Sequence, residues 1–193
     1  MPHDGPTSPM ETRATASRVV YENRWMRVRE DQIERADGSA GVYGVVEKLD
    51  FSLVIPLDGD GFYLVEQYRY PVGARYWEFP QGTWEDNPEA GPLAVAQEEL
   101  EAETGLRAGS MRRLGEVFGA YGLTAQRCHV FVATDLAAGP ARLEPEEQDL
   151  RVGHVPFAAF CDLVADGRIK DAATLAAYSL LLLDHGVRFG ATS

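Results

Sequence analysis

A cluster of glutamates near the middle of the chain has the residue types and the spacing to bind a hard divalent cation. Positions 98–103 hold four carboxylates, Glu98, Glu99, Glu101 and Glu103. In a helix Glu99 and Glu103 would share one face, where two like charges destabilise the helix by about 0.2–0.5 kcal/mol. Mg²⁺ or Mn²⁺ would offset that repulsion, since both ions prefer carboxylate oxygens, and Mg²⁺ commonly shares its coordination with a substrate phosphate. The spacing therefore predicts a metal site for phosphate chemistry, and the alternative is an acidic helix that is only solvated.

The glutamates must be positioned by a helix and by the glycine-bearing loop before it. The helix is expected to begin near Pro92 and to stop at Gly105, because proline is tolerated in a first helical turn and glycine is favoured just past a last one. Its expected core stripe consists of Leu93, Ala96 and Leu100. On a helical wheel Glu99 and Glu103 then lie at the edge of the buried surface, facing the loop.

Composition limits the classes of protein to which the chain can belong. Its 193 residues suffice for one domain with a sizeable core. Eighteen basic residues against 30 acidic ones give a net charge of −12, which repels nucleic acid and anionic membrane. Two cysteines, Cys128 and Cys161, have no metal-binding spacing, and no signal peptide or long apolar run is present. We therefore expect a cytoplasmic protein that acts on a small molecule, without nucleic-acid or membrane partners.

The chain is expected to divide into three parts. Residues 1–16 are rich in Pro, Ser and Thr, which predicts a disordered tail. Residues 17–50 alternate apolar and polar around a bend at Asn23 and a second turn at Asp37–Gly38, which predicts a small antiparallel sheet. Residues 51–188 form the main domain.

The main domain is expected to be a sheet covered on both faces. Its predicted strands are 52–57, 62–70, 111–118, 127–135 and 150–155, and two further helices are predicted at 157–166 and 172–183. Apolar residues occur at both parities of a strand, as in Leu64 and Val65, so neither face is expected to be open to water. Asp171 is placed to cap the last helix and Gly186 to end it.

The run at positions 98–106, EELEAETGL, resembles the signature of the Nudix hydrolases, R-E-U-x-E-E-x-G-U, where U is a bulky aliphatic residue. The segments VYENRWMRVRED, VEQYRYPVG, EEQDLRV and GRIKDAATLAAYSLLLL look like the ADP-ribose pyrophosphatase branch of that family, and the resemblance spans about residues 17–184. It implies an α+β Nudix fold, an α/β/α sandwich with a mixed central sheet, preceded by a small N-terminal antiparallel sheet that contributes to a homodimer.

The resemblance also implies an activity. The expected reaction is divalent-metal-dependent hydrolysis of the pyrophosphate bond of a nucleoside diphosphate linked to another moiety, such as ADP-ribose or a nucleotide sugar, giving a nucleoside monophosphate and a sugar phosphate. Glu98 replaces the arginine of the signature, Ala102 replaces one of its glutamates, and the loop after Gly82 is two residues longer. These departures motivate the alternative, a nucleotide-binding or regulatory Nudix module with weak or no turnover.

Several residues acquire roles through the resemblance. Glu99 and Glu103 would hold the metal and act in catalysis, with the backbone carbonyl of Gln81 as an extra ligand. Gly82 would let the loop backbone approach a phosphate. Arg69, at the end of a predicted strand, resembles a substrate-contacting arginine, and the alternative is a surface charge paired with a carboxylate.

The catalytic base and the nucleobase contacts are also expectations from the resemblance. Aligning EEQDLRV on the family's loop points to Glu146 as the base, and Glu147 would take the role after a slip of one residue; a solvated acidic loop is the alternative. Tyr21 and Trp25, near the hairpin bend, could stack on a nucleobase across a dimer, or could simply pack the hairpin.

Overall fold

The structure is a computed structural model, and it describes residues 12–83, 87, 89–139 and 149–187. The chain divides into two compact units. The N-terminal unit consists of Met1–Leu49 and Ala120–Gln126, and the main unit consists of Asp50–Gly119 and Arg127–Ser193. Among the described residues, no helix has the length and apolar character needed to cross a membrane.

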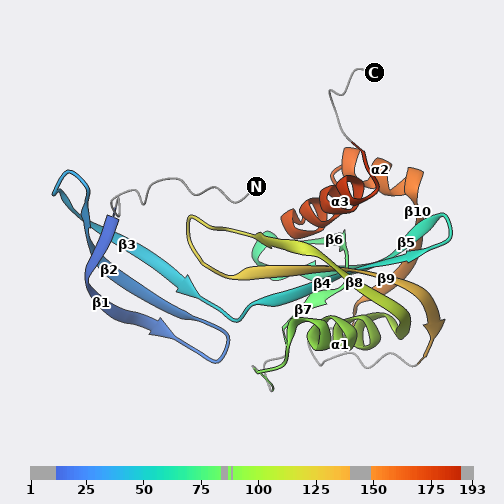
Figure 1. The fold of residues 1–193 in the computed structure, drawn as a ribbon, viewed down its shortest axis with the longest axis horizontal. Helices are drawn as coiled ribbons and strands as arrows, with labels where there is room; N and C mark the ends of the chain where they lie inside the picture. The colour runs from blue at the N-terminus through green and yellow to red at the C-terminus, as the bar shows by residue number, and fades with distance from the viewer. Residues whose placement is uncertain (1–11, 84–86, 88, 140–148, 188–193) are drawn as a thin grey trace. The chain divides into compact units, whose positions relative to one another are not determined.

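The N-terminal unit is a three-stranded antiparallel sheet in the order β1-β2-β3, formed by β1 (Thr12–Glu22), β2 (Arg27–Arg35) and β3 (Ala40–Glu47) (Figure 1). The predicted bend at Asn23 is confirmed, since its Oδ1 accepts hydrogen bonds of 2.9 Å from the backbone N–H groups of Trp25 and Met26. The second turn is also confirmed, with Gly38 at a φ of 79°.

Strand β1 begins earlier than composition predicts. Residues 12–16, expected as part of a disordered tail, are strand and pair with β2 from Thr12 onward. The backbone groups of β2 accept a partner strand whether its side chains are apolar or polar, so composition misplaces the boundary. The rest of the expected tail, residues 1–11, lies outside the described residues.

Residues 120–126 belong to the N-terminal unit although they follow β8 in the chain. The backbone N–H of Val46 donates to the carbonyl of Leu123 over 2.9 Å, and the Tyr43 hydroxyl donates to the carbonyl of Gly122 over 2.8 Å. The side chain of Gln126 donates to the carbonyl of Leu49 over 2.6 Å. The predicted strands 111–118 and 127–135 leave this segment only as a connection, so its bonds to β3 were not predicted.

The main unit contains a seven-stranded sheet in the order β10-β5-β4-β9-β8, with β6 on β5 and β7 on β4. Its strands are β4 (Phe51–Asp58), β5 (Gly61–Arg69), β6 (Ala74–Glu78), β7 (Gln81–Gly82), β8 (Leu106–Phe118), β9 (Arg127–Ala138) and β10 (Arg151–Pro156). The pair β4–β9 is parallel and the others are antiparallel, so the sheet is mixed. The helices are η1 (Tyr70–Val72), α1 (Pro92–Thr104), α2 (Phe157–Ala165) and α3 (Ala172–Asp184).

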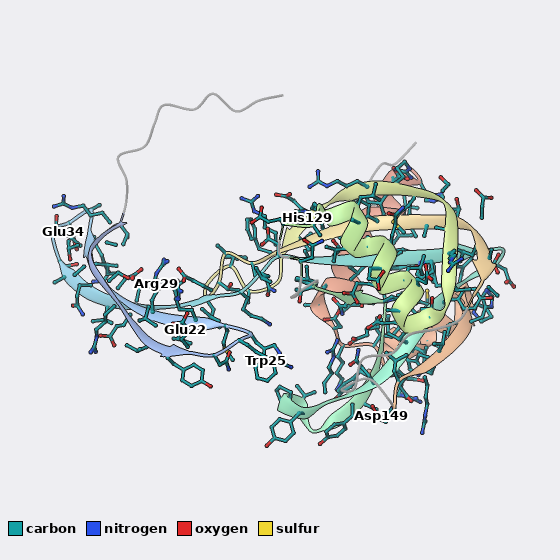
Figure 2. The ribbon with its side chains drawn as sticks, turned by 90° about the horizontal axis from the view of Figure 1, so that it is seen from below. Glu22, Trp25, Arg29, Glu34, His129 and Asp149 are labelled. Carbon is teal, nitrogen blue, oxygen red and sulfur yellow. The ribbon has the colours of Figure 1, made fainter. Side chains whose placement is uncertain are left out.

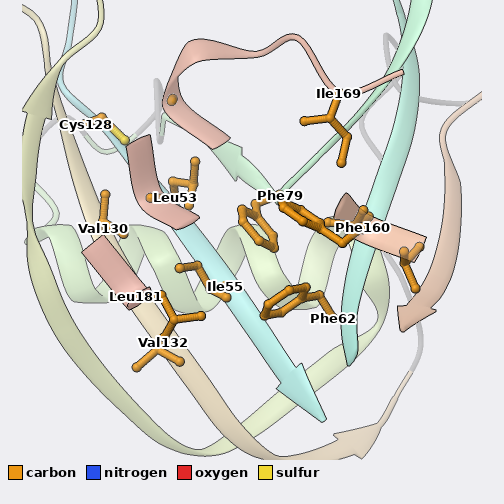
Figure 3. Packing of buried hydrophobic residues seen from close by; sticks show 14 residues of the cluster. Leu53, Ile55, Phe62, Phe79, Cys128, Val130, Val132, Phe160, Ile169 and Leu181 are labelled. Carbon is orange, nitrogen blue, oxygen red and sulfur yellow. The ribbon is translucent and has the colours of Figure 1, made fainter. Parts of the chain in front are cut away.

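Helices cover both faces of this sheet, which confirms the predicted α/β/α sandwich (Figure 1). On one face α1 packs through Ala96 and Leu100 against a cluster that includes Val54. On the other face α2 and α3 enclose a larger cluster that includes Ile55 and Phe160 (Figure 3). Val54 and Ile55 are neighbours in β4 and both are fully buried, so successive side chains enter opposite cores.

The boundaries of α1 follow the predicted signals, but its buried face does not. Pro92 opens the helix and Gly105 closes it in the left-handed conformation, with a φ of 69°. Leu93, an expected core residue, is exposed, while Val95 and Glu103 are buried. At about 100° per residue, the buried positions centre nearer to Glu103 than to Leu93. The carboxylate of Glu103 is therefore inside the protein rather than at the edge of the buried surface.

Candidate functional site

Strand β7 and helix α1 meet through a close approach between Gly82 and Glu99. A Cβ atom built on Gly82 would lie 2.6 Å from the Glu99 carboxylate carbon and from each of its oxygens. Any side chain at position 82 would thus displace the carboxylate. The glycine brings the loop backbone directly against Glu99, as the sequence predicts for the side of the helix that faces the loop.

One helical turn further on, Glu103 meets the same short strand. Glu103 is 1% exposed, and its Oε2 accepts a hydrogen bond of 3.2 Å from the backbone N–H of Gln81. Burying a carboxylate is costly unless polar groups or cations compensate it. Glu99 and Glu103 are therefore brought together against the main chain of residues 81–82.

These two carboxylates have the chemistry to hold a divalent cation. Within the described ranges of the chain, no three Asp, Glu, His or Cys side chains gather closely enough to hold a metal ion by themselves. Two carboxylates beside a strand backbone nevertheless suit Mg²⁺ or Mn²⁺, which bind through one or two carboxylates and complete their coordination with water and phosphate oxygens. Glu99, Glu103 and the carbonyl of Gln81 are the groups that could hold it.

Arg69 is anchored to a buried carboxylate beside this pair. It forms an ion pair with Glu78 of β6, and its Nε donates to Glu78 Oε2 over 3.3 Å. Gln67 Nε2 also donates to Glu78 Oε1, over 2.9 Å. Glu78 is 2% exposed while the Arg69 side chain is 42% exposed, so the guanidinium reaches from the interior toward solvent. The expected alternative, a pairing with a carboxylate, is observed, but the partner is buried.

The pKa values around Arg69 reflect burial and opposing charges. Burial raises the pKa of the Glu78 carboxyl above its usual value, and the charge and hydrogen bond of Arg69 only partly oppose this. Burial alone would lower the pKa of Arg69, but the negative charges of Glu78, Glu103 and Asp171 raise it. Arg69 therefore stays cationic in the field of three carboxylates, which is the charge needed near a phosphate.

The first turn of α3 holds the segment that leads into β7. Asp171 caps the helix as predicted, because its Oδ2 accepts the Thr174 N–H over 2.7 Å. The same Oδ2 accepts the side-chain amide of Gln81 over 3.0 Å. The Thr174 hydroxyl oxygen accepts the backbone N–H of Phe79 over 3.1 Å.

Glu78 and the second contact of Asp171 were missed by sequence reasoning. The one signal for Glu78 is a charged residue between Trp77 and Phe79 in a strand that is otherwise apolar at this end. Such a residue must be paired when the sheet is covered on both faces. No local signal links Asp171 to a residue 90 positions earlier.

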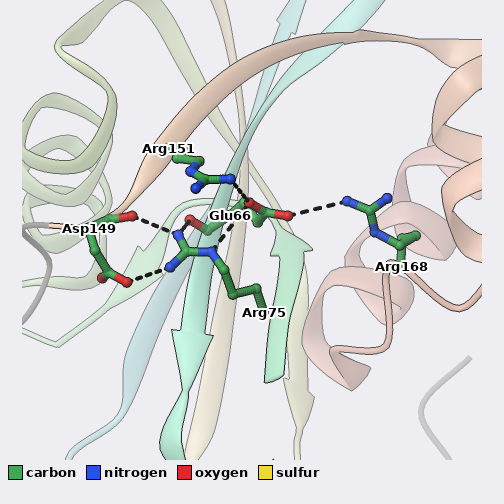
Figure 4. Close-up of polar contacts among 5 residues, drawn as sticks. All are labelled: Glu66, Arg75, Asp149, Arg151 and Arg168. Atoms are coloured by element: carbon green, nitrogen blue, oxygen red, sulfur yellow. Dashed lines mark hydrogen bonds and ion pairs between the residues drawn. The ribbon is translucent and has the colours of Figure 1, made fainter. Parts of the chain in front are cut away.

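A separate polar network anchors the start of β10 (Figure 4). The buried carboxylate of Glu66 accepts from Arg75, Arg151 and Arg168 over 3.2–3.4 Å. Arg75 also forms an ion pair with Asp149 and donates to its carbonyl over 2.6 Å. The expected catalytic bases, Glu146 and Glu147, precede Asp149 and lie outside the described residues.

The two aromatic residues expected to contact a nucleobase are in the N-terminal unit. Tyr21 is 53% exposed in β1. Trp25, which Figure 2 labels, is 50% exposed in the turn that follows β1. The guanidinium carbon of Arg24 lies 4.3 Å from the centre of the Trp25 ring. About half of each aromatic residue is exposed, so contact with a nucleobase stays a prediction, beside the alternative of packing within the hairpin.

Comparisons with known proteins agree with this architecture. Residues 48–178 match the NUDIX domain, and residues 13–46 match the nucleoside diphosphate sugar hydrolase N-terminal domain. An ADP-ribose pyrophosphatase of Mycobacterium tuberculosis is 29% identical over 177 residues, which cover 91% of this chain and 84% of that protein. A GDP-mannose pyrophosphatase of Escherichia coli is 26% identical over 125 residues, which cover 56% of this chain and 65% of that protein.

A solved structure supports the same fold. The crystal structure of an ADP compounds hydrolase superposes with a TM-score of 0.80 at 21% sequence identity, covering 93% of this chain and 98% of that one. At this level of identity the likeness concerns the fold. The NUDIX domain match, in contrast, spans most of the chain and includes both Glu99 and Glu103. This protein belongs to the Nudix family.

Proposed function

We propose that this protein is a divalent-metal-dependent pyrophosphohydrolase acting on a nucleoside diphosphate linked to another moiety, either ADP-ribose or a nucleotide sugar. The products would be a nucleoside monophosphate and a sugar phosphate. The observation that carries this proposal is the pair of carboxylates, Glu99 and Glu103, against the backbone of Gln81 and Gly82. Relatives named for ADP-ribose and for GDP-mannose share a substrate chemistry, a pyrophosphate between a nucleoside and a sugar.

Nudix hydrolases generally need a divalent metal ion, and the hard oxygen donors of this site favour Mg²⁺ or Mn²⁺. When bound, such an ion neutralises charge on the pyrophosphate oxygens and lowers the pKa of a coordinated water. Glu99 and Glu103 would hold the ion, with the carbonyl of Gln81 as a further ligand. Gly82 would let the loop backbone approach a phosphate beside the bound ion, because its lack of a side chain leaves room there for the Glu99 carboxylate.

Arg69 would bind the substrate. Glu78 binds the guanidinium through its Nε and one terminal nitrogen. The side chain of Arg69 is partly exposed, so the remaining N–H donors are directed toward solvent. Guanidinium groups form charge-assisted, often bidentate, hydrogen bonds with phosphate oxygens. In a protein of net charge −12, this cation would offset local repulsion of a doubly charged pyrophosphate.

The general base would be Glu146, with Glu147 as the alternative after a one-residue slip. A base must come within about 3 Å of the water that it activates. The two candidates are separated by comparing Glu146→Gln with Glu147→Gln in a pH–rate profile. At low pH, kcat falls as the general base becomes protonated. Replacing the residue that acts as the base removes this fall, and replacing the other residue leaves it in place.

The protein would act as a homodimer formed through its N-terminal unit. The N-terminal unit exposes large apolar side chains, among them Val20 and Val42, and a second copy of the chain would cover them. In such a dimer Tyr21 and Trp25 would be placed to stack on the nucleobase. A cytoplasmic location fits the two free thiols, since a reducing compartment keeps cysteines unpaired.

The function is tested with a panel of ADP-ribose, GDP-mannose, UDP-glucose, NADH and dinucleoside polyphosphates, each with Mg²⁺ and with Mn²⁺. Products are identified by phosphorus NMR, beside Glu99→Gln and Glu103→Gln. Glu101→Gln is the matched control, because Glu101 lies on the same helix but pairs with Arg107 over 2.6 Å. We expect the two site variants to lose turnover by about 100-fold or more and the control to retain it.

Two outcomes contradict the proposal. Unchanged turnover in both Glu99→Gln and Glu103→Gln would remove these carboxylates from catalysis. Stabilisation of the protein by a substrate without any product would instead support the nucleotide-binding module, since a ligand that binds only the folded state raises the unfolding temperature.

A further inference from the structure

The segment that presents backbone to the two metal-site carboxylates is held from two sides. On one side it pairs with β4, through Leu53 opposite Gln81 and through a hydrogen bond of 2.9 Å from the Val54 N–H to the carbonyl of Pro80. On the other side the first turn of α3 holds it through Asp171 and Thr174. Both the sheet and helix α3 therefore fix the position of this segment, although Asp171 lies 90 residues after Gln81 in the chain.

Asp171 does more than a helix cap requires. A cap needs one acceptor for an N–H of the first turn, and Ser or Asn serves as well as Asp. The Oδ2 of Asp171 satisfies that need at 2.7 Å and also accepts the Gln81 side chain at 3.0 Å. A carboxylate oxygen forms a stronger hydrogen bond than a neutral acceptor, so Gln81 is held more firmly than a hydroxyl would hold it.

Gln81 connects this contact to the site. Its backbone N–H donates to Glu103, and its neighbour Gly82 lies against Glu99. Fixing the side-chain amide of Gln81 at its far end limits the conformations open to its backbone, and so limits the directions of its N–H and C=O groups. Asp171 is thereby linked to Glu103 through Gln81, and to Glu99 through Gln81 and its neighbour Gly82.

The negative charge of Asp171 also affects the pKa values of ionisable groups near the site. It is among the groups that raise the pKa of Arg69, and it adds to the effect of burial in raising the pKa of Glu78. Burial together with this charge raises the pKa of the Cys128 thiol to about 12. Arg69 of β5, Glu78 of β6 and Cys128 of β9 therefore all lie within reach of the charge of Asp171.

We propose that Asp171 is a positioning residue of the metal site: through the side chain of Gln81 it holds the peptide groups of residues 81–82 in register with Glu99 and Glu103. This inference rests on the proposed function, because it assigns Asp171 a role at the site where the cation would bind. A residue behind a metal ligand typically changes metal affinity or activity by about 10–100-fold when it is replaced.

The test compares variants that separate the cap from the bridge to Gln81. Asp171→Ser keeps an acceptor for the Thr174 N–H, but its side chain is one bond too short for Gln81. Asp171→Asn keeps an oxygen able to accept both donors and removes only the charge. Gln81→Ala removes the bridge from the other end. Asp162→Ser, at an exposed position of α2, is the matched control for the same chemical change.

Three quantities are measured for each variant: the dissociation constant of Mn²⁺ by electron paramagnetic resonance, kcat and KM with ADP-ribose, and the unfolding temperature without metal. Asp171→Ser and Gln81→Ala are each expected to weaken Mn²⁺ binding about 10-fold and to lower kcat more than they raise KM. Asp171→Asn should stay within about threefold of the wild type, since it keeps both acceptor contacts and gives up only the added strength of a charged acceptor. The double variant Asp171→Ser/Gln81→Ala should be no worse than either single variant, because both remove one interaction.

The inference is overturned if Asp171→Ser and Gln81→Ala bind Mn²⁺ as tightly as the wild type, or if their effects add in the double variant. A lower unfolding temperature in Asp171→Ser with unchanged Mn²⁺ binding would leave Asp171 as a helix cap only, which also overturns it. Failure of the proposed function looks different, because then Glu99→Gln and Glu103→Gln would themselves leave Mn²⁺ binding unchanged.

Discussion

The two units of this chain are both built on strands, but strand residues are buried in the main unit and mostly exposed in the N-terminal unit. In the main unit three successive residues of β4, Leu53, Val54 and Ile55, are fully buried between two layers of helices. In the N-terminal unit every residue of β1 is exposed, and among the described residues of that unit only Asp31 and Ile33 are buried. The main unit thus carries its own core, whereas the described residues of the N-terminal unit leave large apolar side chains exposed.

Most described ion pairs of the N-terminal unit have exposed partners, with Arg29–Asp31 as the exception, whereas the main unit also pairs buried carboxylates. In the main unit the partners of the ion pairs include carboxylates that are almost fully buried. Arg69 compensates Glu78, and Arg75 is among the arginines that compensate Glu66. In the N-terminal unit pairs such as Arg18–Glu30 lie between neighbouring strands in solvent, and the labelled Glu22 and Glu34 in Figure 2 belong to this group. Exposed pairs contribute little to stability, whereas the buried Asp31, which pairs with Arg29 in the same unit, is closer to the buried carboxylates of the main unit.

The largest expected effect comes from the core of the main unit. Phe160→Ala should lower the free energy of unfolding by about 3–5 kcal/mol, because Phe160 is fully buried among three aromatic rings and its loss leaves a cavity. Urea unfolding measures this. Phe118→Ala is the matched control, since Phe118 is 49% exposed and should cost less than about 1 kcal/mol. Equal losses for the two variants would contradict the assigned core.

The second effect is a pH-dependent destabilisation by Arg69→Met. Arg69 opposes the rise that burial imposes on the pKa of Glu78, so its loss raises that pKa further. A carboxyl whose pKa is higher in the folded than in the unfolded state contributes stability at low pH, and this is lost as the pH rises through the folded-state value. The loss should be about 2 kcal/mol at pH 8, below the usual cost of breaking a buried pair because Arg69 is partly exposed.

The loss should shrink at pH 5, where the Glu78 carboxyl is more protonated. Chemical unfolding at the two pH values measures the difference, and Arg13→Met, which breaks an exposed pair with Glu34, serves as control. A loss from Arg69→Met that is the same at both pH values would rule out Glu78 as the group responsible.

These contrasts also separate what sequence could predict from what it could not. Turn and cap residues such as Asn23, Gly105 and Asp171 identified most element boundaries, because their effects are local. Burial on both faces followed from apolar residues at both parities of the strands. The depth of Glu103 was missed, since a helical wheel does not say which side of an apolar stripe meets the sheet.

Contacts between distant segments account for the remaining differences. The bridge from Gln81 to Asp171 spans 90 residues, and the bond from Tyr43 to Gly122 spans 79. Neither end of such a contact is marked by a local pattern, because the partners become neighbours only after the sheet has formed. The site could therefore be predicted as a pair of carboxylates, but its supporting residues could not.

The third effect concerns the apolar surface of the N-terminal unit. If a second copy covers it, Val42→Asp should weaken dimerisation at least about 10-fold, which corresponds to about 1.4 kcal/mol. Analytical ultracentrifugation over a range of concentrations measures this. Val152→Asp, at a half-exposed position of β10 in the main unit, is the control. Dimerisation that is unaffected by Val42→Asp would remove this surface from the proposed interface.

The smallest effect should come from the exposed ion pairs. Arg18→Ala breaks hydrogen bonds of 2.8 and 3.1 Å to Glu30, yet it should cost no more than about 0.5 kcal/mol, because both partners are solvated. Thermal unfolding at low and high salt is the measurement. A loss as large as that of Arg69→Met would show that the two classes of ion pair do not differ as described.

The central claim is that Glu99 and Glu103 jointly bind a divalent cation at the backbone of residues 81–82. The most direct test is a Mn²⁺ titration followed by electron paramagnetic resonance, with and without a non-hydrolysable ADP-ribose analogue, for the wild type, Glu99→Gln, Glu103→Gln and the control Glu101→Gln. Both site variants should bind Mn²⁺ at least about 10-fold more weakly, and the control should match the wild type. Unchanged Mn²⁺ affinity in Glu99→Gln and Glu103→Gln, with the analogue present, would contradict the claim.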